Sequence, residues 1–162
     1  MKTLILYATK TGTTEKCAKL LAEKLENAEV YNLKNGEPDT EGYDMIIVGG
    51  SIRAGMLHRK AKKYIKEKCG QQKNKKTAFF VCCADSEKAD EYLKSNIPAD
   101  ILERSVCSGG FGGEMDIDKQ KGLMKFFLKR MRENAEKKGT SVPPAQILPE
   151  NIERFAEKIK SI

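Results

Sequence analysis

The chain has 162 residues, a length that suits one domain with a full hydrophobic core, so we expect a single domain over residues 1–162. Thirty basic residues against 23 acidic ones give a formal net charge of +7, which favours phosphorylated ligands, nucleic acid or an acidic membrane surface as partners. The sequence lacks an arginine-rich tract, aromatic residues interleaved with basic ones, and a zinc framework, so we do not expect nucleic-acid binding. It also lacks a leader pattern and any apolar run long enough to cross a bilayer, and we expect a cytoplasmic protein.

The five cysteines form an odd set without metal-type spacing. Two of them, Cys82 and Cys83, are adjacent and would point to opposite faces of a strand. We therefore expect reduced cysteines that pack in the core, and no metal site. A single histidine, His58, excludes any site that needs several imidazoles.

A short polar loop follows the first apolar run of the chain. Residues 4–8 predict a buried strand, and the six residues after it are Thr9, Lys10, Thr11, Gly12, Thr13 and Thr14. Their hydroxyls, the close backbone approach that glycine permits, and the positive end of the next helix suit a phosphate group. The glycine spacings of the common dinucleotide and nucleoside-triphosphate loops are absent. The alternative is that Thr13 only caps the helix within an ordinary turn, and the residues alone leave both interpretations open.

Strands and helices alternate along the rest of the chain. The predicted strands are residues 29–33, 45–48, 77–82 and 103–107. The predicted helices are residues 13–27, 58–69, 89–96, 119–138 and 149–162. Residues 108–113 are so rich in glycine that we expect a loop there.

This alternation predicts a doubly wound α/β fold, with a five-stranded parallel sheet in the order 2-1-3-4-5 and helices on both faces. Ligands of such sheets bind at the carboxyl ends of the strands, next to the point where the strand order reverses. In this chain, three loops converge there, at residues 9–14, 49–55 and 83–86.

The pattern Thr9-x-Thr11-Gly12-x-Thr14 after an apolar first strand resembles the phosphate loop of flavodoxins, which hold the phosphate of FMN. A narrower resemblance covers residues 43–58. The segment Ser51-Ile52-Arg53-x-Gly55-x-x-His58 is similar to that of the menaquinone-dependent protoporphyrinogen oxidases, a flavodoxin-fold family of haem biosynthesis. The similarity extends more loosely over the whole chain.

The resemblance implies an FMN-binding flavodoxin-like oxidoreductase. Residues 9–14 would take the phosphate, and a second set would lie beside the isoalloxazine ring. That second set is Gly50, Ser51, Ile52, Arg53, Ala54, Gly55, Cys83, Ala84, Asp85 and Ser86. These loops lack the Trp and Tyr with which many flavodoxins sandwich the ring. The alternatives are an electron carrier of the flavodoxin type, or a binding module of this fold without redox turnover, so enzymatic activity stays open.

Two residues of the narrower resemblance are candidates for catalysis. Arg53 would steady an anionic reduced flavin or a substrate carboxylate, and the alternative is a solvated loop charge. His58 would shuttle a proton near neutral pH, and the alternative is a cap or packing residue at the start of a helix. The pair Gly49-Gly50 either bonds the flavin edge or forms a tight turn from strand to helix.

The predicted helix over residues 119–138 is strongly basic, with an apolar stripe that includes Leu123, Phe127 and Met131. One interpretation is peripheral contact with anionic lipid close to a quinone pool. The other is a solvated face above a stripe that covers the sheet. The expected partners are a small-molecule or protein redox partner, with a quinone and a membrane surface as candidates.

Overall fold

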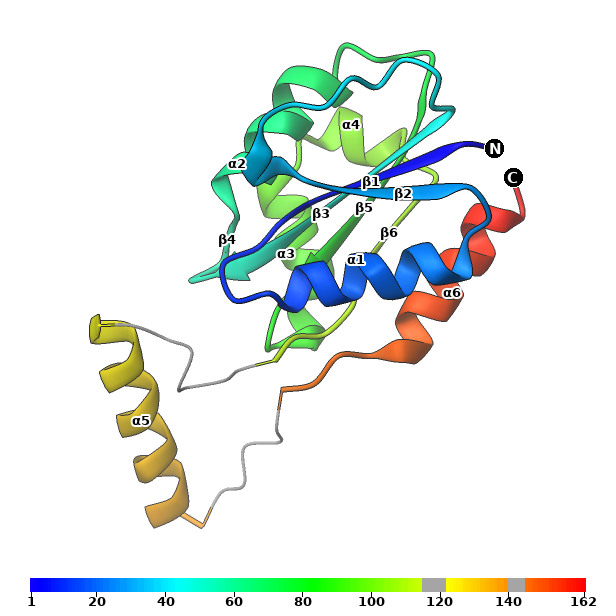
Figure 1. Cartoon of the computed structure of the whole chain (residues 1–162). Helices are drawn as coiled ribbons and strands as arrows, with labels where there is room; N and C mark the ends of the chain where they lie inside the picture. The colour runs from blue at the N-terminus through cyan, green and yellow to red at the C-terminus, as the bar shows by residue number, and fades with distance from the viewer. Residues whose placement is uncertain (115–121, 140–144) are drawn as a thin grey trace.

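A central parallel sheet organises the computed structural model, which describes residues 1–114, 122–139 and 145–162 (Figure 1). Its parallel strands are β1 (Thr3–Ala8), β2 (Ala28–Asn32), β3 (Met45–Arg53), β5 (Lys76–Cys82) and β6 (Cys107–Gly110). They lie in the order β2-β1-β3-β5-β6, which confirms the predicted order 2-1-3-4-5. A short sixth strand, β4 (Met56–Leu57), pairs antiparallel with β3 and was not predicted.

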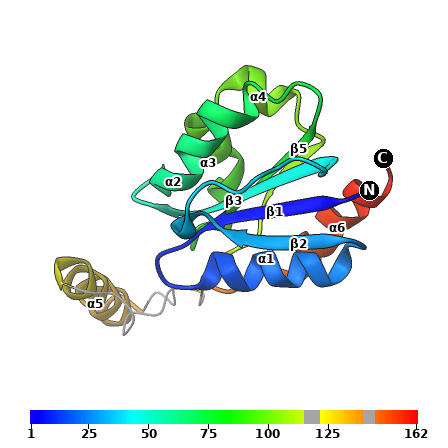
Figure 2. The same ribbon diagram turned by 45° about the horizontal axis from the view of Figure 1, so that its top comes forward.

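Helices cover both faces of the sheet, as expected (Figure 2). On one face lie α1 (Thr13–Lys24) and α6 (Pro149–Lys160). On the other lie α2 (Arg59–Tyr64), α3 (Ala89–Asn96) and α4 (Ala99–Glu103). A π-helical turn continues α2 over Ile65–Cys69, and short 3₁₀ turns occupy Leu33–Asn35 and Ser86–Lys88. None of the helices that the structure describes is both long and apolar enough to cross a bilayer.

The central strands are apolar on both sides because helices cover both sides. All six residues of β1 are buried, and so are the first six of β3. The adjacent Cys82 and Cys83 belong to the cores on opposite faces, as the strand geometry predicts. All five cysteines are free and buried, which confirms the expectation of packing residues.

Strand β3 runs beyond the predicted strand 45–48 and ends at Arg53. Its two glycines therefore do not form a turn to a helix, so that interpretation is wrong. A Cβ on Gly49 would lie 1.9 Å from Cζ of Phe80, and one on Gly50 would lie 2.6 Å from Cδ1 of Leu57. Both positions require glycine, because Phe80 and Leu57 occupy the space that a side chain there would need.

The last parallel strand starts later than predicted. Residues 99–103 form α4, and β6 covers Cys107–Gly110, part of the stretch that we expected to be a loop. Gly110 of this strand serves close packing, because a Cβ on it would lie 2.3 Å from Cβ of Ala89 in α3. The prediction treated these glycines as a loop, and it therefore placed the strand too early in the sequence.

Helix α5 (Gly122–Lys137) lies apart from both helical layers (Figures 1 and 2). Residues 119–121 of the predicted basic helix lie outside the described residues. The expectation that its apolar stripe covers the sheet is wrong, because Leu123 is 87% exposed and Phe127 59% exposed. Helix α6 covers the sheet beside α1 instead, through Ile152 and Phe155, which are buried.

Candidate functional site

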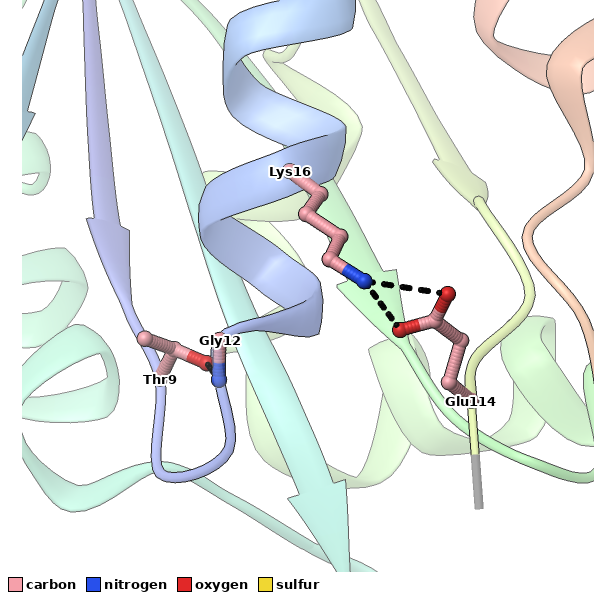
Figure 3. A network of polar contacts seen from close by, with 4 residues as sticks. All are labelled: Thr9, Gly12, Lys16 and Glu114. Atoms are coloured by element: carbon pink, nitrogen blue, oxygen red, sulfur yellow. Dashed lines mark hydrogen bonds and ion pairs between the residues drawn. The ribbon is translucent and has the colours of Figure 1, made fainter. Parts of the chain in front are cut away.

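The loop after β1 closes on itself before α1 begins. The hydroxyl of Thr9 accepts a 3.0 Å hydrogen bond from the backbone N–H of Gly12 (Figure 3). Gly12 has a φ of 94° and stands at the N-cap of α1, where no side chain caps the helix. Thr13 therefore does not cap α1, and the capping interpretation is wrong. The left-handed backbone at Gly12 explains the glycine, and the uncapped N–H groups of the first turn stay available to an anion.

Thr14 carries a buried hydroxyl at the start of α1. The residue is 0% exposed, and its Oγ1 has no hydrogen-bond partner within the part of the chain that the structure describes. The Cys17 thiol and burial raise the pKa of Cys82, and the Thr14 hydroxyl opposes this shift, which places the hydroxyl close to that sulfur. Sulfur is a weak acceptor. A buried hydroxyl in this situation favours the arrival of a stronger acceptor, such as a phosphate oxygen.

The end of β3 and strand β4 form a hairpin at the carboxyl edge of the sheet. Ile52 pairs with Leu57, and Arg53 pairs with Met56. The two turn residues, Ala54 and Gly55, have φ values of 48° and 75°. Positive φ at both positions is typical of tight two-residue hairpins. The predicted loop 49–55 is thus the end of β3 and the turn of a hairpin, which carries Arg53.

A cleft of about 280 Å³ lies between the three predicted loops. From the first loop it is lined by Lys10, Thr11 and Thr13; from the hairpin by Ser51, Ile52, Arg53, Ala54 and Gly55; and from the third loop by Cys83, Ala84 and Asp85. The structure therefore brings the three loops together. The hydroxyl of Ser51 is buried in this region and has no partner among the described residues.

The remaining predicted site residues, His58 among them, do not line this cleft. Thr9 and Gly12 close the first loop, Thr14 is buried in the first turn of α1, and Gly50 packs against Leu57 under the hairpin. Ser86 lines a second cleft, of about 300 Å³, between α3 and α6.

Tyr92 of α3 lines the first cleft and was missed by the sequence analysis. Its half-buried ring lies beside the hairpin turn, since a Cβ on Gly55 would lie 3.9 Å from Cε1 of Tyr92. Its position in the sequence could have indicated this, because Tyr92 comes directly before the buried Leu93 and so lies at the margin of the face of α3 that packs on the sheet. Among the described residues, the aromatic side chain of the cleft is therefore contributed by a helix and not by the three loops.

His58 stands at the N-cap of α2, where its Nδ1 accepts a 3.3 Å hydrogen bond from the N–H of Lys60. A neutral His58 thus keeps its proton on Nε2. Burial lowers the pKa of His58, and the charges of Lys10, Lys60 and Arg59 lower it further. Lys10 of the first loop is therefore close enough for its charge to act on the imidazole of His58.

Cys83 lies in the cleft but is not a reactive thiol. Its Sγ donates a 3.2 Å hydrogen bond to the carbonyl of Asp85, and burial raises the pKa of Cys83 to about 11. A thiol with so high a pKa is a poor nucleophile near neutral pH. Cys83 therefore shapes the loop through this hydrogen bond.

An ion pair joins Glu114, which lines the cleft, to Lys16 of α1. Nζ of Lys16 lies 2.9 and 3.2 Å from the two carboxylate oxygens of Glu114 (Figure 3). Glu114 follows Gly113, whose close packing on Cys83 leaves no room for a side chain, since a Cβ there would lie 2.8 Å from the backbone carbon of Cys83. Residues 113–114 therefore close the cleft beside the first loop.

Comparison with known proteins identifies the family. The model of the family described as "Flavodoxin domain" matches residues 4–141. The chain belongs to the flavodoxin family. Among solved structures, this flavodoxin-family protein superposes on the Fusobacterium nucleatum flavodoxin bound to flavin mononucleotide with a TM-score of 0.56 and 16% identity, covering 99% of this chain and 98% of that one. At this identity the match shows the fold alone.

Two curated relatives are more similar in sequence. Protoporphyrinogen IX dehydrogenase [quinone] of Escherichia coli is 35% identical over 49% of this chain and 47% of the relative. This flavodoxin-family protein thus spans about half the length of that relative. An uncharacterized protein of Methanocaldococcus jannaschii is 33% identical over 80% of this chain and 99% of its own length.

Proposed function

We propose that the chain binds FMN in the cleft between the three loops. The observation that carries this proposal is the pair of buried hydroxyls, on Thr14 and Ser51, that lack partners among the described residues. Such groups cost about 1–3 kcal/mol each when unsatisfied, so the fold retains them at the expense of stability. A phosphate over α1 and a polar ring edge at the hairpin would supply acceptors for both.

The residues present fit the group. Thr11, Thr13 and the free N–H groups of α1 would hold the phosphate, with Lys10 as a positive charge at the rim. The hairpin, residues 83–86 and Tyr92 would lie around the isoalloxazine. When bound, FMN supplies electron transfer, and the chain orients it and excludes water.

We propose that Arg53 supplies a positive charge at this site and that His58 donates a proton. Arg53 lines the cleft and presents a fixed positive charge to an anionic ring or a carboxylate. Neutral His58, whose Nδ1 is held by the helix end, keeps Nε2–H for donation. Its lowered pKa keeps it uncharged at neutral pH.

For the reaction, we propose an oxidoreductase of haem biosynthesis that oxidises a porphyrinogen and passes the electrons to a quinone. This rests on the likeness of half of the chain to protoporphyrinogen IX dehydrogenase [quinone]. Isoprenoid quinones dissolve in bilayers, so the proposal includes a cytoplasmic protein in peripheral contact with a membrane through α5.

A flavodoxin-type electron carrier is the second candidate. Met56 favours it, because this large apolar side chain is 56% exposed on the hairpin that lines the cleft. An apolar contact beside a redox group suits a protein partner. A binding module without redox turnover is the third alternative, and it predicts no flavin binding.

Anaerobic turnover separates the candidates. The FMN-loaded protein is mixed with protoporphyrinogen and a menaquinone analogue, and the porphyrin absorbance is followed. We expect porphyrin to form with consumption of quinone, and the Arg53→Ala variant to be slower. Reversible reduction of the flavin without porphyrin formation would favour the carrier.

A further inference from the structure

Helix α5 exposes a row of large apolar side chains. Leu123, Phe127 and Met131 follow each other at intervals of four residues, so they share one face of the helix. They are 87%, 59% and 54% exposed. Contiguous apolar surface of this kind marks a contact site when the rest of the chain leaves it uncovered.

The charges of α5 select the partner. Residues 122–138 carry six basic and two acidic side chains, and thus more than half of the net charge of +7. Arg132 lies on the side of the helix away from the apolar row, and Arg130, seven residues after Leu123, lies at the edge of that row. A basic polar face with Phe and Leu on the other side and low overall hydropathy is the pattern of helices that lie in the headgroup layer of a membrane.

We call residues 114–146, which carry α5 between β6 and α6, the insertion, and the residues at its two ends its root. The root fixes where α5 can act. The N–H of Cys83 donates to the carbonyl of Gly112 at 2.9 Å, and the N–H of Gly113 donates to that of Gln146 at 3.1 Å. Both ends of the insertion therefore leave the body side by side, next to the cleft. Leu128 of α5 itself lines this cleft.

We infer that α5 docks the protein on an anionic phospholipid surface, with Leu123, Phe127 and Met131 among the acyl chains and its basic side chains on headgroup phosphates. This deepens the membrane contact of the proposed function by naming the lipid and the contact residues. Because the root of the insertion borders the cleft, docking holds the cleft close to the same surface.

The chain offers a matched pair for the test. Phe126 is 63% exposed, much like Phe127, but it shares its side of the helix with Arg130 and Glu133. The full-length protein is floated with vesicles of phosphatidylglycerol and phosphatidylcholine, or of phosphatidylcholine alone. We expect binding to the anionic vesicles to be about tenfold tighter or more. We expect Phe127→Glu to weaken it about tenfold and Phe126→Glu by less than about threefold.

A spectroscopic test uses the absence of tryptophan from the sequence. A single probe is introduced as Phe127→Trp or, in the control, Phe126→Trp. On anionic vesicles we expect the emission of the first to shift to the blue and that of the second to change little. No binding, equal binding to neutral vesicles, or equal behaviour of the two positions would overturn the inference. FMN affinity, measured separately, does not enter this outcome.

Discussion

The side-chain amide of Asn96 in α3 donates a 2.9 Å hydrogen bond to the backbone carbonyl of Gly55 at the turn of the hairpin. Its oxygen accepts a 3.0 Å hydrogen bond from the N–H of Leu57 in β4. Asn96 is 4% exposed, so both bonds are protected from water. One buried amide thus fixes the hairpin that lines the cleft to the helix that contributes Tyr92.

Replacement of this amide tests its role. We expect Asn96→Ala to lower the free energy of unfolding by about 2 kcal/mol, because the N–H of Leu57 loses its partner in a buried place. FMN affinity should fall as the hairpin loosens. Lys94→Ala, at an exposed position of the same helix, is the neighbouring control, with an expected change within about 0.5 kcal/mol in urea unfolding. Equal effects of the two changes would contradict this role.

The hairpin turn stores strain at Ala54. A φ of 48° is unfavourable for alanine by about 1–2 kcal/mol, whereas glycine adopts it freely. We expect Ala54→Gly to raise the free energy of unfolding by about 0.5 kcal/mol, after the larger entropy of glycine in the unfolded chain is subtracted. Gly55→Ala, at a φ of 75°, should lower it by about 1 kcal/mol. Thermal unfolding checks the signs, and destabilisation by Ala54→Gly would count against a strained turn.

The stability of the protein should depend on pH through His58, whose pKa is lowered in part by Lys10 of the first loop. Burial and nearby Lys10 lower its pKa below the usual value of 6.5. The unfolded chain therefore binds the proton more readily, and we expect stability to fall as the pH decreases below about 6.5. NMR titration of the one histidine measures this pKa, which should rise in Lys10→Gln and stay unchanged in Lys34→Gln. A pKa at or above 6.5 in the unaltered protein would refute the assignment.

Alkaline stability depends on the buried thiols. Burial raises the pKa of Cys107 to about 11 and that of Cys69 to about 12, from an ordinary value near 9. Between about pH 9 and 11 the unfolded chain loses thiol protons that the folded chain keeps, so the free energy of unfolding should fall as the pH rises. We expect Cys69→Ala to flatten this decline in urea unfolding at several pH values. An unchanged slope would show that Cys69 does not contribute.

The sequence predicted the sheet order and the three loops because continuous apolar runs and intervening amphipathic helices carry that information locally. It did not predict α4, the hairpin or the full length of β3. Those depend on contacts between distant residues, such as Phe80 over Gly49 and Asn96 under Gly55. Tyr92 was missed for the same reason, since its place in the cleft follows from the packing of α3.

The position of α5 was also beyond local reasoning. Its apolar stripe and that of α6 look alike in sequence, and only tertiary packing decides that α6 covers the sheet. The loop predicted at β6 was wrong for the same reason, because the close contact with Ala89 that explains Gly110 cannot be read from the sequence.

The most direct test of the phosphate site is a fluorescence titration of the apoprotein with FMN and with riboflavin, in the unaltered chain and in Thr14→Val. Valine has the shape of threonine and replaces only the hydroxyl, which has no partner in the part of the chain that the structure describes. We predict tight quenching of FMN but not of riboflavin. We also predict that Thr14→Val stabilises the apoprotein by about 1 kcal/mol while it weakens FMN binding about tenfold. Equal affinity for FMN and riboflavin, or no binding of either by the unaltered chain, would contradict the account.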